Sequence, residues 1–376
     1  MVPAPSPADM LVTALGLRDF RSYERAQIRL GPGLNVIYGP NGAGKTNLLE
    51  GLYFGCTGRS CRTSNEREVI RFGAPAARVV VNACAAGQEH ELSVGFVPGE
   101  PKRLRADGAP VERLTDVQDR PLASVFMPER LELIKGPPAL RRGHVDQVVA
   151  ALWPQRAFTR RSYAQTLAQR NALLARARRG RAPAAALDTW DHELARHAVV
   201  LRDDRAEVVA LLGAPFAAHA TRLGLAGTPA LDYRPRTRAA SSEEFAAELL
   251  TRRDSDLERG FSGHGPHRDE LALTRDGREL RSFGSQGEQR LSLLALLLAE
   301  REVLLALRDR APLMLLDDVM SELDTQRRTL LADELVAAGQ SIITTTELAH
   351  VPGAQAPGVT RLRVGEGVVR QEALAA

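Results

Sequence analysis

A glycine-rich loop that ends in a lysine and a threonine is the first feature with recognisable chemistry. It fits the spacing G-x-x-x-x-G-K-[ST] and consists of Gly39, Pro40, Asn41, Gly42, Ala43, Gly44, Lys45 and Thr46. Its glycines allow successive backbone N–H groups to curl around a phosphate, while Lys45 is placed for the β- and γ-phosphates and Thr46 for Mg²⁺. A chance glycine-rich turn is the alternative, but the chain has lysine only at positions 45, 102 and 135. The loop predicts a site for ATP, or at least a nucleoside triphosphate, with Mg²⁺.

Two carboxylates follow a short apolar run much later in the chain. Residues 313–316 are all apolar and predict a buried strand that ends at Asp317 and Asp318. Ligands of open α/β sheets bind at the carboxyl ends of strands, so we expect Asp317 to hold Mg²⁺ with Thr46. Asp318 is expected to orient the attacking water, which makes Lys45, Asp317 and Asp318 the predicted catalytic set. A solvated acidic turn is the alternative, and the upstream glycine loop argues against it.

A polar run before a long apolar helix suggests how such a site is completed. Its residues are Ser285, Gln286, Gly287, Glu288 and Gln289, and Ser285 and Glu288 also have the spacing of a helix capping box. The run resembles the signature of the ABC ATPases, which opens a helix in the same way, and Ser321 and Asp324 resemble the D-loop of that superfamily. This resemblance implies that the signature contacts the γ-phosphate bound by a second subunit.

The elements that position these motifs can be inferred from periodicity and turn residues. Strands are expected at 11–17, 26–30 and 34–38, with a hairpin at 78–84 and 90–97 and a helix after the glycine loop. The C-terminal third alternates: a helix from Ser285 to about Arg308, a strand at 313–316, a helix at 327–338, a strand at 341–346 and a hairpin near Gly365. This order predicts the α/β class, and the resemblance implies an ABC-type ATPase head with an antiparallel β subdomain and a P-loop parallel sheet.

The middle of the chain has a different character. From about 140 to 255, Ala/Leu/Arg-rich segments replace strand-like runs, with interruptions at Pro154, Gly180, Pro183, Gly213 and Pro215. This pattern predicts an inserted α-helical lobe of short helices. The expected domains are a flexible extension at 1–9, ATPase lobe I at 10–125 and 260–376, and helical lobe II at 126–259.

Longer strings narrow the resemblance to the RecF family of bacterial recombination mediators. They run from Leu15 to Tyr23, from Phe126 to Gly136, from Gly265 to Glu270 and from Ser285 to Arg290. The resemblance implies an ATP-dependent homodimer that binds duplex DNA and junctions of single- and double-stranded DNA. It implies slow, DNA-dependent ATP hydrolysis, and work with RecR and RecO to load RecA in recombination, repair and replication.

The chain departs from the wider ABC pattern at three places. Asp318 stands where most ABC ATPases carry glutamate, and residues 125–128 offer no glutamine for a Q-loop. The strand at 341–346 ends in threonines rather than a switch histidine, which leaves Thr346 or Glu347 as candidates. Arg21, with Tyr23, is the expected contact to ATP on the base side.

Positive charge gathers in the middle region. The arginines concerned are Arg160, Arg161, Arg170, Arg176, Arg178, Arg179 and Arg181, in a chain of net charge +4 and pI near 9.2. A solvated helix face is the ordinary reason for such a run. The other hypothesis is that Arg176, Arg178 and Arg179 contact DNA phosphates without reading bases.

Several classes of protein fit the chain less well. Its longest apolar stretch is too short to cross a bilayer and its start lacks the pattern of a secretory signal, so no membrane partner and a cytoplasmic location are expected. Cys56, Cys61 and Cys84 predict buried thiols, and the run from His264 to Asp269 predicts a Gly-Pro loop rather than a metal site. A transporter's nucleotide-binding subunit and a chromosome-structuring head with a coiled-coil arm remain the rival interpretations.

Overall fold

The computed structural model describes residues 10–117, 120–337 and 339–372, so the extension expected at 1–9 lies outside the described residues. The chain divides into two compact units. Unit 1 holds the residues up to Leu131, Arg222–Leu225 and those from Leu293 onward; unit 2 holds Glu132–Thr221 and Ala226–Ser292. These boundaries differ from the expected lobes at 126–131, 222–225 and 260–292. The largest difference, at 260–292, arises because β10 (Glu270–Arg275) pairs along its length with β9 (Pro229–Arg234).

A mostly parallel sheet in unit 1 carries the ends of the predicted motifs. Its order is β15-β14-β3-β13-β12-β8, and only β15 runs antiparallel to its neighbour. The strands are β3 (Leu34–Tyr38), β8 (Ala123–Phe126), β12 (Leu313–Leu316), β13 (Ser341–Thr345), β14 (Thr360–Gly365) and β15 (Val368–Gln371). Because β3, β12 and β13 are parallel neighbours, the residues that follow them meet at one edge of the sheet.

An antiparallel sheet forms the second layer of unit 1, with the order β2-β1-β4-β5-β6-β7. Its strands are β1 (Leu11–Phe20), β2 (Tyr23–Arg29), β4 (Ala77–Ala85), β5 (Gln88–Phe96), β6 (Arg103–Ala106) and β7 (Ala109–Pro110). The expected hairpin is confirmed, because β4 and β5 pair from Ala77 and Phe96 to Ala85 and Gln88. Buried and exposed residues alternate along these strands, as one covered and one open face require.

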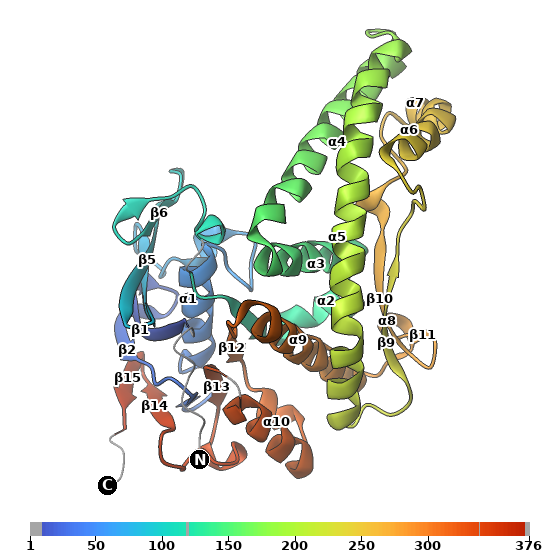
Figure 1. The fold of residues 1–376 in the computed structure, drawn as a ribbon. Coiled ribbons are helices and arrows are strands. Elements are labelled where there is room, and N and C mark those ends of the chain that lie inside the picture. The colour runs from blue at the N-terminus through green and yellow to red at the C-terminus, as the bar shows by residue number, and fades with distance from the viewer. Residues whose placement is uncertain (1–9, 118–119, 338, 373–376) are drawn as a thin grey trace. The chain divides into compact units, whose positions relative to one another are not determined.

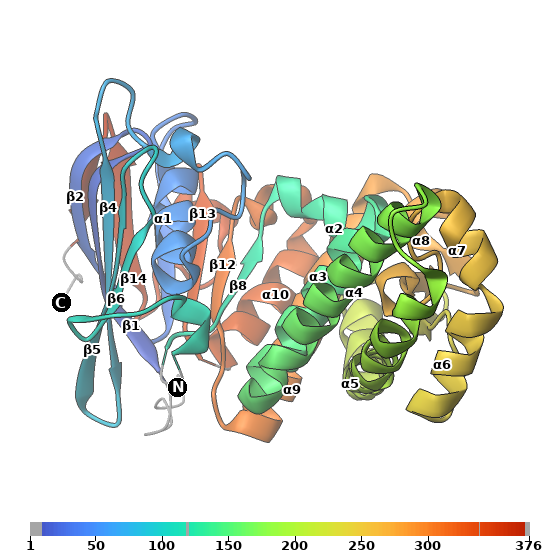
Figure 2. The same ribbon diagram turned by 90° about the horizontal axis from the view of Figure 1, so that it is seen from above.

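Helix α1 (Lys45–Thr57) lies between the two sheets of unit 1, as Figure 2 shows. Leu48, Leu49 and Leu52 are fully buried on it and join a core that includes Leu15 and Val79 of the antiparallel sheet and Leu315 of the parallel sheet. Burying each of these side chains contributes about 1.5–3 kcal/mol. This packing fixes the first turn of α1 against the edge where the strands end.

Helices dominate unit 2 (Figure 1). They are α2 (Glu132–Lys135), α3 (Pro138–Leu152), α4 (Ala157–Arg178), α5 (Leu187–Arg222), α6 (Ser242–Thr251), α7 (Arg253–Arg259) and α8 (Leu280–Phe283). Three strands accompany them in the order β11-β10-β9, where β11 is Arg278–Glu279. Tyr163 of α4, Leu194 and Ala198 of α5 and Phe245 of α6 form a shared core.

Two expectations for this region were wrong. The helices are not all short, because α5 continues for 36 residues through Gly213 and Pro215. Leu212 and Phe216 beside the proline are almost fully buried, so packing outweighs the missing backbone hydrogen bond. The region is also not purely helical, since β9 pairs with a strand that lies far along the chain.

The last two helices lead into the acidic strand and out of it. Helix α9 (Gln286–Arg308) begins in unit 2 and continues in unit 1, and α10 (Thr325–Ala337) follows β12. The predicted helices at 285–308 and 327–338 are thereby confirmed to within two residues at each end. None of the helices within the described ranges combines the length and apolarity needed to cross a membrane.

Candidate nucleotide-binding site

The glycine loop joins β3 directly to the first turn of α1. Gly39 and Gly44 have φ angles of 153° and 106°. A Cβ on Gly39 would lie 2.1 Å from the carbonyl oxygen of Val364, and one on Gly44 would lie 2.7 Å from the hydroxyl oxygen of Tyr23. Only glycine fits these two positions, and the resulting turn brings the backbone to a helix N-terminus, where anions bind favourably.

Lys45 is the first residue of α1, and its side chain folds back over the loop. Its Nζ donates hydrogen bonds to the carbonyl oxygens of Gly39 and Pro40, at 2.7 and 2.9 Å. Burial lowers the pKa of this ammonium, and the negative charges of Asp317 and Asp318 oppose that shift. The ammonium is therefore held close to two carboxylates and to the loop backbone, as a group that binds phosphate oxygens must be.

Asp317 connects the glycine loop with the acidic strand. The hydroxyl of Thr46 lies 2.9 Å from its Oδ2, and the hydroxyl of Thr344 donates to its Oδ1 at 2.7 Å. Burial raises the pKa of this carboxyl, although both hydrogen bonds lower it. Magnesium in proteins usually takes one or two carboxylates together with phosphate oxygens and waters. A hydroxyl and a carboxylate in contact fit that donor set.

Asp318 sits in a strained backbone conformation with φ of 46°. Its N–H donates to the hydroxyl of Thr344 at 2.9 Å, and its Oδ2 lies 3.0 Å from the hydroxyl oxygen of Ser321. Its other carboxylate oxygen, Oδ1, is buried and has no hydrogen-bond partner among the described residues. A buried unpaired carboxylate oxygen beside Lys45 and Asp317 is costly unless it binds a ligand.

Two residues of this site were missed in the sequence. Thr344 contacts Asp317 and also holds the backbone of Asp318. A role for Thr346 or Glu347 in place of the switch histidine stays a prediction. Glu129 lies just beyond β8, where a Q-loop glutamine was sought, and its charge raises the pKa of Asp317. Thr344 is the fourth residue of a predicted strand. Its place near the carboxyl end of that strand, where ligands bind, is the feature of the sequence that points to the site.

The guanidinium of Arg21 is bound to the carboxylate of Glu50, a fully buried residue of α1. Its Nε and Nη2 donate to the two carboxylate oxygens at 2.8 and 2.7 Å, and its Nη1 donates to the carbonyl oxygen of Glu68. All three guanidinium nitrogens are therefore engaged. A contact between Arg21 and the base of a nucleotide stays a prediction, and it would have to use the face of the guanidinium.

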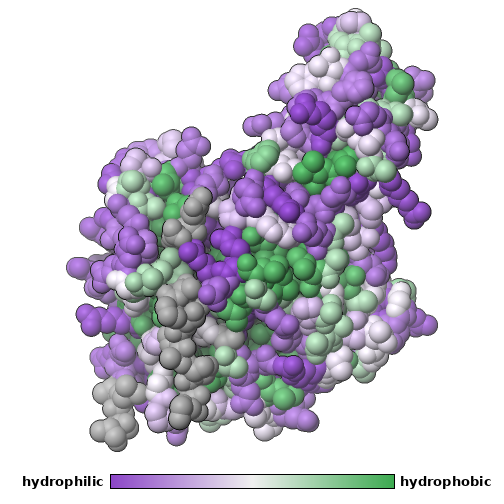
Figure 3. Space-filling model, in the orientation of Figure 1, coloured by the Kyte–Doolittle hydropathy of each residue, from purple (hydrophilic) through white to green (hydrophobic). Residues whose placement is uncertain are grey.

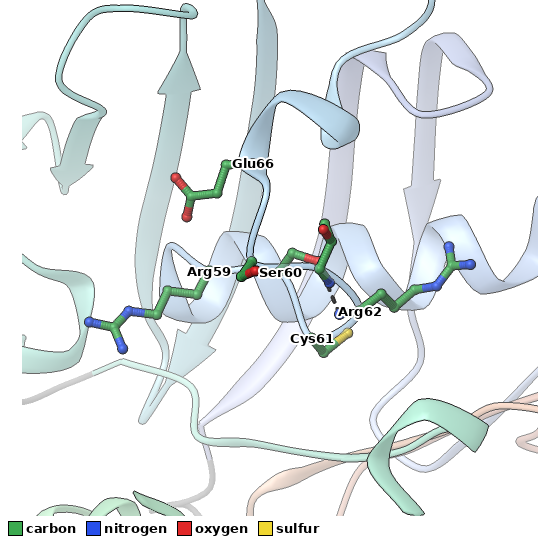
Figure 4. Close-up of a pocket in the computed structure, with 7 residues that line it drawn as sticks. Arg59, Ser60, Cys61, Arg62 and Glu66 are labelled. Carbon is green, nitrogen blue, oxygen red and sulfur yellow. Dashed lines mark hydrogen bonds between the residues drawn. The ribbon is translucent and has the colours of Figure 1, made fainter. Parts of the chain in front are cut away.

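The loop after α1 completes the surroundings of Glu50. Ser60 and Arg62 also donate to this carboxylate, at 2.6 and 3.2 Å. Figure 4 shows the hollow that this loop lines, with Arg59 and Arg62 pointing in opposite directions. Cys61 lines it too, and burial raises the pKa of its thiol to about 12. The site's polar shell is thus anchored on one buried carboxylate.

The side chains of both D-loop residues, Ser321 and Asp324, form hydrogen bonds with backbone groups. The hydroxyl of Ser321 donates to the carbonyl oxygen of Asp318 at 2.8 Å, and a carboxylate oxygen of Asp324 accepts from the N–H of Arg327 at 2.9 Å. Asp324 thereby caps the start of α10. These contacts fix the chain that leaves Asp318.

The signature opens α9 in unit 2 as a complete capping box. Ser285 N–H donates to Glu288 Oε2 at 2.8 Å, and Glu288 N–H lies 3.3 Å from the hydroxyl of Ser285. Ser285, Gln286 and Gly287 are exposed, whereas Gln289 is buried and donates to the carbonyl oxygen of Leu280. Ser285 and Glu288 thus form the capping box that their spacing predicted. The start of the helix is nevertheless exposed and available to an anion.

The arginines of the middle region fall into two groups. Arg176, Arg178 and Arg179 are exposed where α4 ends. Figure 3 shows many hydrophilic residues at the tip that α4 and α5 form. Arg170 is fully buried and pairs with Asp191 and Asp256 at 2.6 and 2.7 Å, so its place among surface arginines was wrong. A run of charges along a helix does not reveal which of them point inward.

The side chains of the loop from His264 to Asp269 bond to neighbouring protein groups. The described residues hold no cluster of three or more His, Cys, Asp or Glu side chains that could bind a metal ion. His267 instead lies between the hydroxyl of Tyr163 and the carbonyl oxygen of Ser262, at 2.7 and 3.0 Å. Because a carbonyl only accepts, Nε2 carries the proton and Nδ1 accepts from Tyr163. Burial lowers the pKa of His267 to about 4.

Comparisons with known proteins agree with this geometry. The chain is 38% identical to the DNA replication and repair protein RecF of Frankia alni, over 96% of this chain and 99% of that protein. It is also 38% identical to the protein of the same description from Streptomyces avermitilis, over 96% and 100%. A solved structure of the recombination mediator RecF with ATP, from the RecFOR pathway, superposes with a TM-score of 0.85 at 25% identity, over 97% of this chain and 98% of that chain.

More distant heads share the architecture alone. An SMC head bound to the C-terminal winged-helix domain of ScpA matches with a TM-score of 0.59 at 16% identity, over 97% of this chain and 98% of that chain. The family described as RecF/RecN/SMC N terminal domain matches residues 11–363. Together with the 38% identity over nearly the full length, this match means that the chain belongs to the RecF family, within the wider RecF/RecN/SMC group.

Proposed function

We propose that this chain is an ATP-dependent DNA-binding protein that acts in recombinational repair and at replication gaps. The observation that carries the proposal is the contact between Thr46 and Asp317, at 2.9 Å, which joins the glycine loop to the acidic strand. Support also comes from relatives described as DNA replication and repair proteins. The resemblance to SMC heads concerns the fold alone, so it gives the rival chromosome-structuring role less support.

Binding of the triphosphate uses groups that already lie together. Lys45 exchanges the carbonyl oxygens of Gly39 and Pro40 for the β- and γ-phosphate oxygens, while the N–H groups of the loop surround the phosphates. Thr46 and Asp317 are the residues that would hold Mg²⁺. When bound, this ion neutralises charge on the phosphate oxygens.

Hydrolysis is assigned to Asp318. Its Oδ1 is the buried carboxylate oxygen without a partner among the described residues, which suits a group that orients the attacking water. Aspartate reaches less far than the glutamate usual in ABC ATPases. We therefore expect slow, DNA-dependent turnover that resets the protein rather than driving rapid cycles.

The second half of the site is proposed to come from another copy of the chain. Ser285, Gln286 and Gly287 are exposed at the start of α9, where helix N–H groups and a hydroxyl can close on a γ-phosphate. Two copies would then enclose two ATP molecules head to head. Bound ATP acts chiefly to join the dimer, and hydrolysis releases it.

The proposed partners are duplex DNA and junctions of single- and double-stranded DNA. The RecFOR pathway named for the similar structure suggests RecR and RecO as protein partners, and we extend the role to loading RecA in the cytoplasm. The exposed Arg176, Arg178 and Arg179 are candidates for phosphate contacts.

Analytical sedimentation tests the proposal directly. The protein is run with ATP, with ADP and without nucleotide, each with and without duplex DNA. A dimer is expected only with ATP, and it should co-sediment with DNA, whereas monomers are expected in the other conditions. Lys45→Ala is the matched control and is expected to stay monomeric with ATP. Monomers in every condition would overturn the proposed mechanism.

A further inference from the structure

The outward face of the antiparallel sheet in unit 1 carries arginines in cross-strand register. Arg18 of β1 is directly opposite Arg25 of β2 on one side and Arg78 of β4 on the other. The same row continues through Gly95 of β5 to Arg103 of β6. All four arginines are exposed, and the apolar residues beside them in sequence point to the opposite face, against α1. We call this row the arginine row.

The arginine row lacks the counter-charges that would favour its folding. Within the described part of the chain, Arg18, Arg25 and Arg78 form no ion pair or side-chain hydrogen bond, and Arg103 has only an exposed pair with Glu100 at 3.0 Å. Like charges directly opposite one another on neighbouring strands are destabilising. Three in a row therefore work against folding, and an anion outside the chain would offset this repulsion.

Two glycines on the same outward face, which we call the glycine floor, leave two positions of the sheet surface at the arginine row without side chains. Gly16 and Gly95 stand at outward positions inside β1 and β5, and neither has the positive φ that would demand glycine. A Cβ at Gly16 would meet Val80 at 3.8 Å, and one at Gly95 would meet Arg103 at 3.7 Å, so both have room. Glycine inside a strand costs stability and often marks the close approach of a ligand or another backbone.

The row is broad and the neighbouring rows extend it. Strands lie about 4.8 Å apart, so Arg25 and Arg103 are roughly 19 Å apart across the sheet. Duplex DNA carries one charge per about 1.7 Å of axis, so a duplex segment of that length carries roughly eleven phosphates on its two strands together. Arg105 is exposed in the next outward row, and Arg29 is exposed in the row after it, which also contains Glu91. Figure 2 shows this sheet with α1 on its other face.

We propose that the arginine row and its glycine floor bind the sugar-phosphate backbone of duplex DNA. This inference rests on the proposed function and assigns a surface to it. Single-stranded DNA is a poorer fit, because proteins that hold it stack bases on aromatic rings, and the outward positions in the arginine row and the two rows beside it carry Arg, Gly, Ser, Val, Asn, Gln, Ala and Glu instead. Guanidinium groups above a flat backbone favour phosphate contacts without base reading.

A charge-matched pair of variants tests the surface. In the first, Arg18, Arg25 and Arg78 are each changed to Gln; in the control, Arg238, Arg252 and Arg278, exposed in unit 2, are changed to Gln. Binding of a fluorescent duplex with ATP is measured from 50 to 300 mM salt. The first variant should bind at least about tenfold more weakly, with a log–log salt slope shallower by up to about 2.7, at about 0.9 for each neutralised phosphate. Its melting temperature should not fall, because repulsion is removed.

A second variant tests the floor without changing charge. Gly16→Thr with Gly95→Thr places side chains where both have room and raises strand propensity, so the melting temperature should hold or rise. Duplex affinity should fall several-fold because the backbone can no longer approach.

The outcomes separate the two levels of the proposal. Wild type that does not bind duplex with ATP overturns the proposed function and this surface together. Wild type that binds, with an arginine-row variant equal to it, overturns the surface alone. Equal losses of affinity in the variant and the control report net charge only and also overturn it. Binding to phosphatidylglycerol vesicles that depends on the row, with DNA binding unaffected, would reassign the face to a membrane and overturn it as well.

Discussion

The nucleotide site of unit 1 and the ionic clusters of unit 2 hold their carboxylates in opposite ways. At the nucleotide site, the hydroxyls of Thr46 and Thr344 contact the carboxylate of Asp317. The hydroxyl of Ser321 lies near Asp318 Oδ2, and Asp318 Oδ1 is left unpaired among the described residues. In unit 2, arginines close on carboxylates at short distances. Arg170 pairs with Asp191 and Asp256, and Arg205 pairs with Asp146 at 2.7 Å.

This difference distinguishes carboxylates that can bind a ligand from carboxylates that stabilise the fold. Hydroxyl groups orient a carboxylate without neutralising it, so its charge remains available to a cation or to a water. A guanidinium neutralises a carboxylate and uses its lone pairs, and breaking such a buried pair leaves an uncompensated charge. Removal of a charge should therefore affect catalysis in unit 1 and stability in unit 2.

The largest expected effect is on turnover at Asp318. Asp318→Asn keeps the shape of the side chain but removes the charge that orients water. Hydrolysis should fall by about 10²–10⁴-fold, the usual contribution of a general base, with ATP binding intact. The free energy of unfolding should hold or rise, because the substitution removes a buried charge beside Asp317. Single-turnover hydrolysis, nucleotide binding and denaturant unfolding measure the three quantities.

Asp333→Asn is the matched control, because this acid is exposed on α10 and has no assigned part in the site. It should leave turnover within a few-fold of wild type. Undiminished hydrolysis by Asp318→Asn would refute the assignment of Asp318.

Arg170→Met should show the opposite behaviour. The substitution leaves Asp191 and Asp256 buried without their shared partner, which costs about 3–5 kcal/mol of the free energy of unfolding. Arg176→Met, on the exposed part of the same helix, should change it by less than about 0.5 kcal/mol. Urea unfolding measures both. Equal effects of the two substitutions would contradict the view that unit 2 depends on closed ion pairs.

The nucleotide site could be predicted because its chemistry depends on local spacing. Gly39 to Thr46 form one turn, and the four apolar residues of β12 point to Asp317 without further information. Asp317 and Thr46 are 271 residues apart in the chain, but the rule that ligands bind at the carboxyl ends of parallel strands brings them together.

The ionic clusters of unit 2 could not be predicted in the same way. Arg170 belongs to a run of arginines in which only the packing of α4 decides which side chain points inward. Helix α5 continues through Pro215 because the packing of its buried neighbours compensates for the missing backbone hydrogen bond. Strand β9 forms because it pairs with β10, which lies far along the chain. Each outcome depends on tertiary packing rather than on the local pattern.

His267, a buried residue of unit 2, should make the free energy of unfolding depend on pH. Its pKa is about 4 in the folded protein and about 6.5 when unfolded, because burial disfavours the charged ring. Its contribution to stability is therefore complete above pH 6.5 and declines as pH falls from 6.5 to 4. The decrease should reach about 3 kcal/mol, at 1.36 kcal/mol for each unit of pKa difference.

Unfolding in urea between pH 7 and pH 4 measures this decrease, with His267→Gln as the reference for all other titrating groups. The free energy of unfolding of the wild type should fall by about 3 kcal/mol more than that of the variant over this range. Parallel curves for the two proteins would show that the ring is solvated and charged in the folded state.

The smallest expected effect concerns the arginines of unit 2 that remain outside the closed clusters. Arg176, Arg178 and Arg179 are exposed at the end of α4, and an ordinary solvated helix end would account for them. If they bind phosphates, changing all three to Ala should weaken duplex binding equally for all sequences. The log–log salt slope should then become shallower by about 0.9 for each phosphate that is no longer neutralised. An unchanged slope would assign them to solvent and leave the sheet of unit 1 as the proposed phosphate-binding surface.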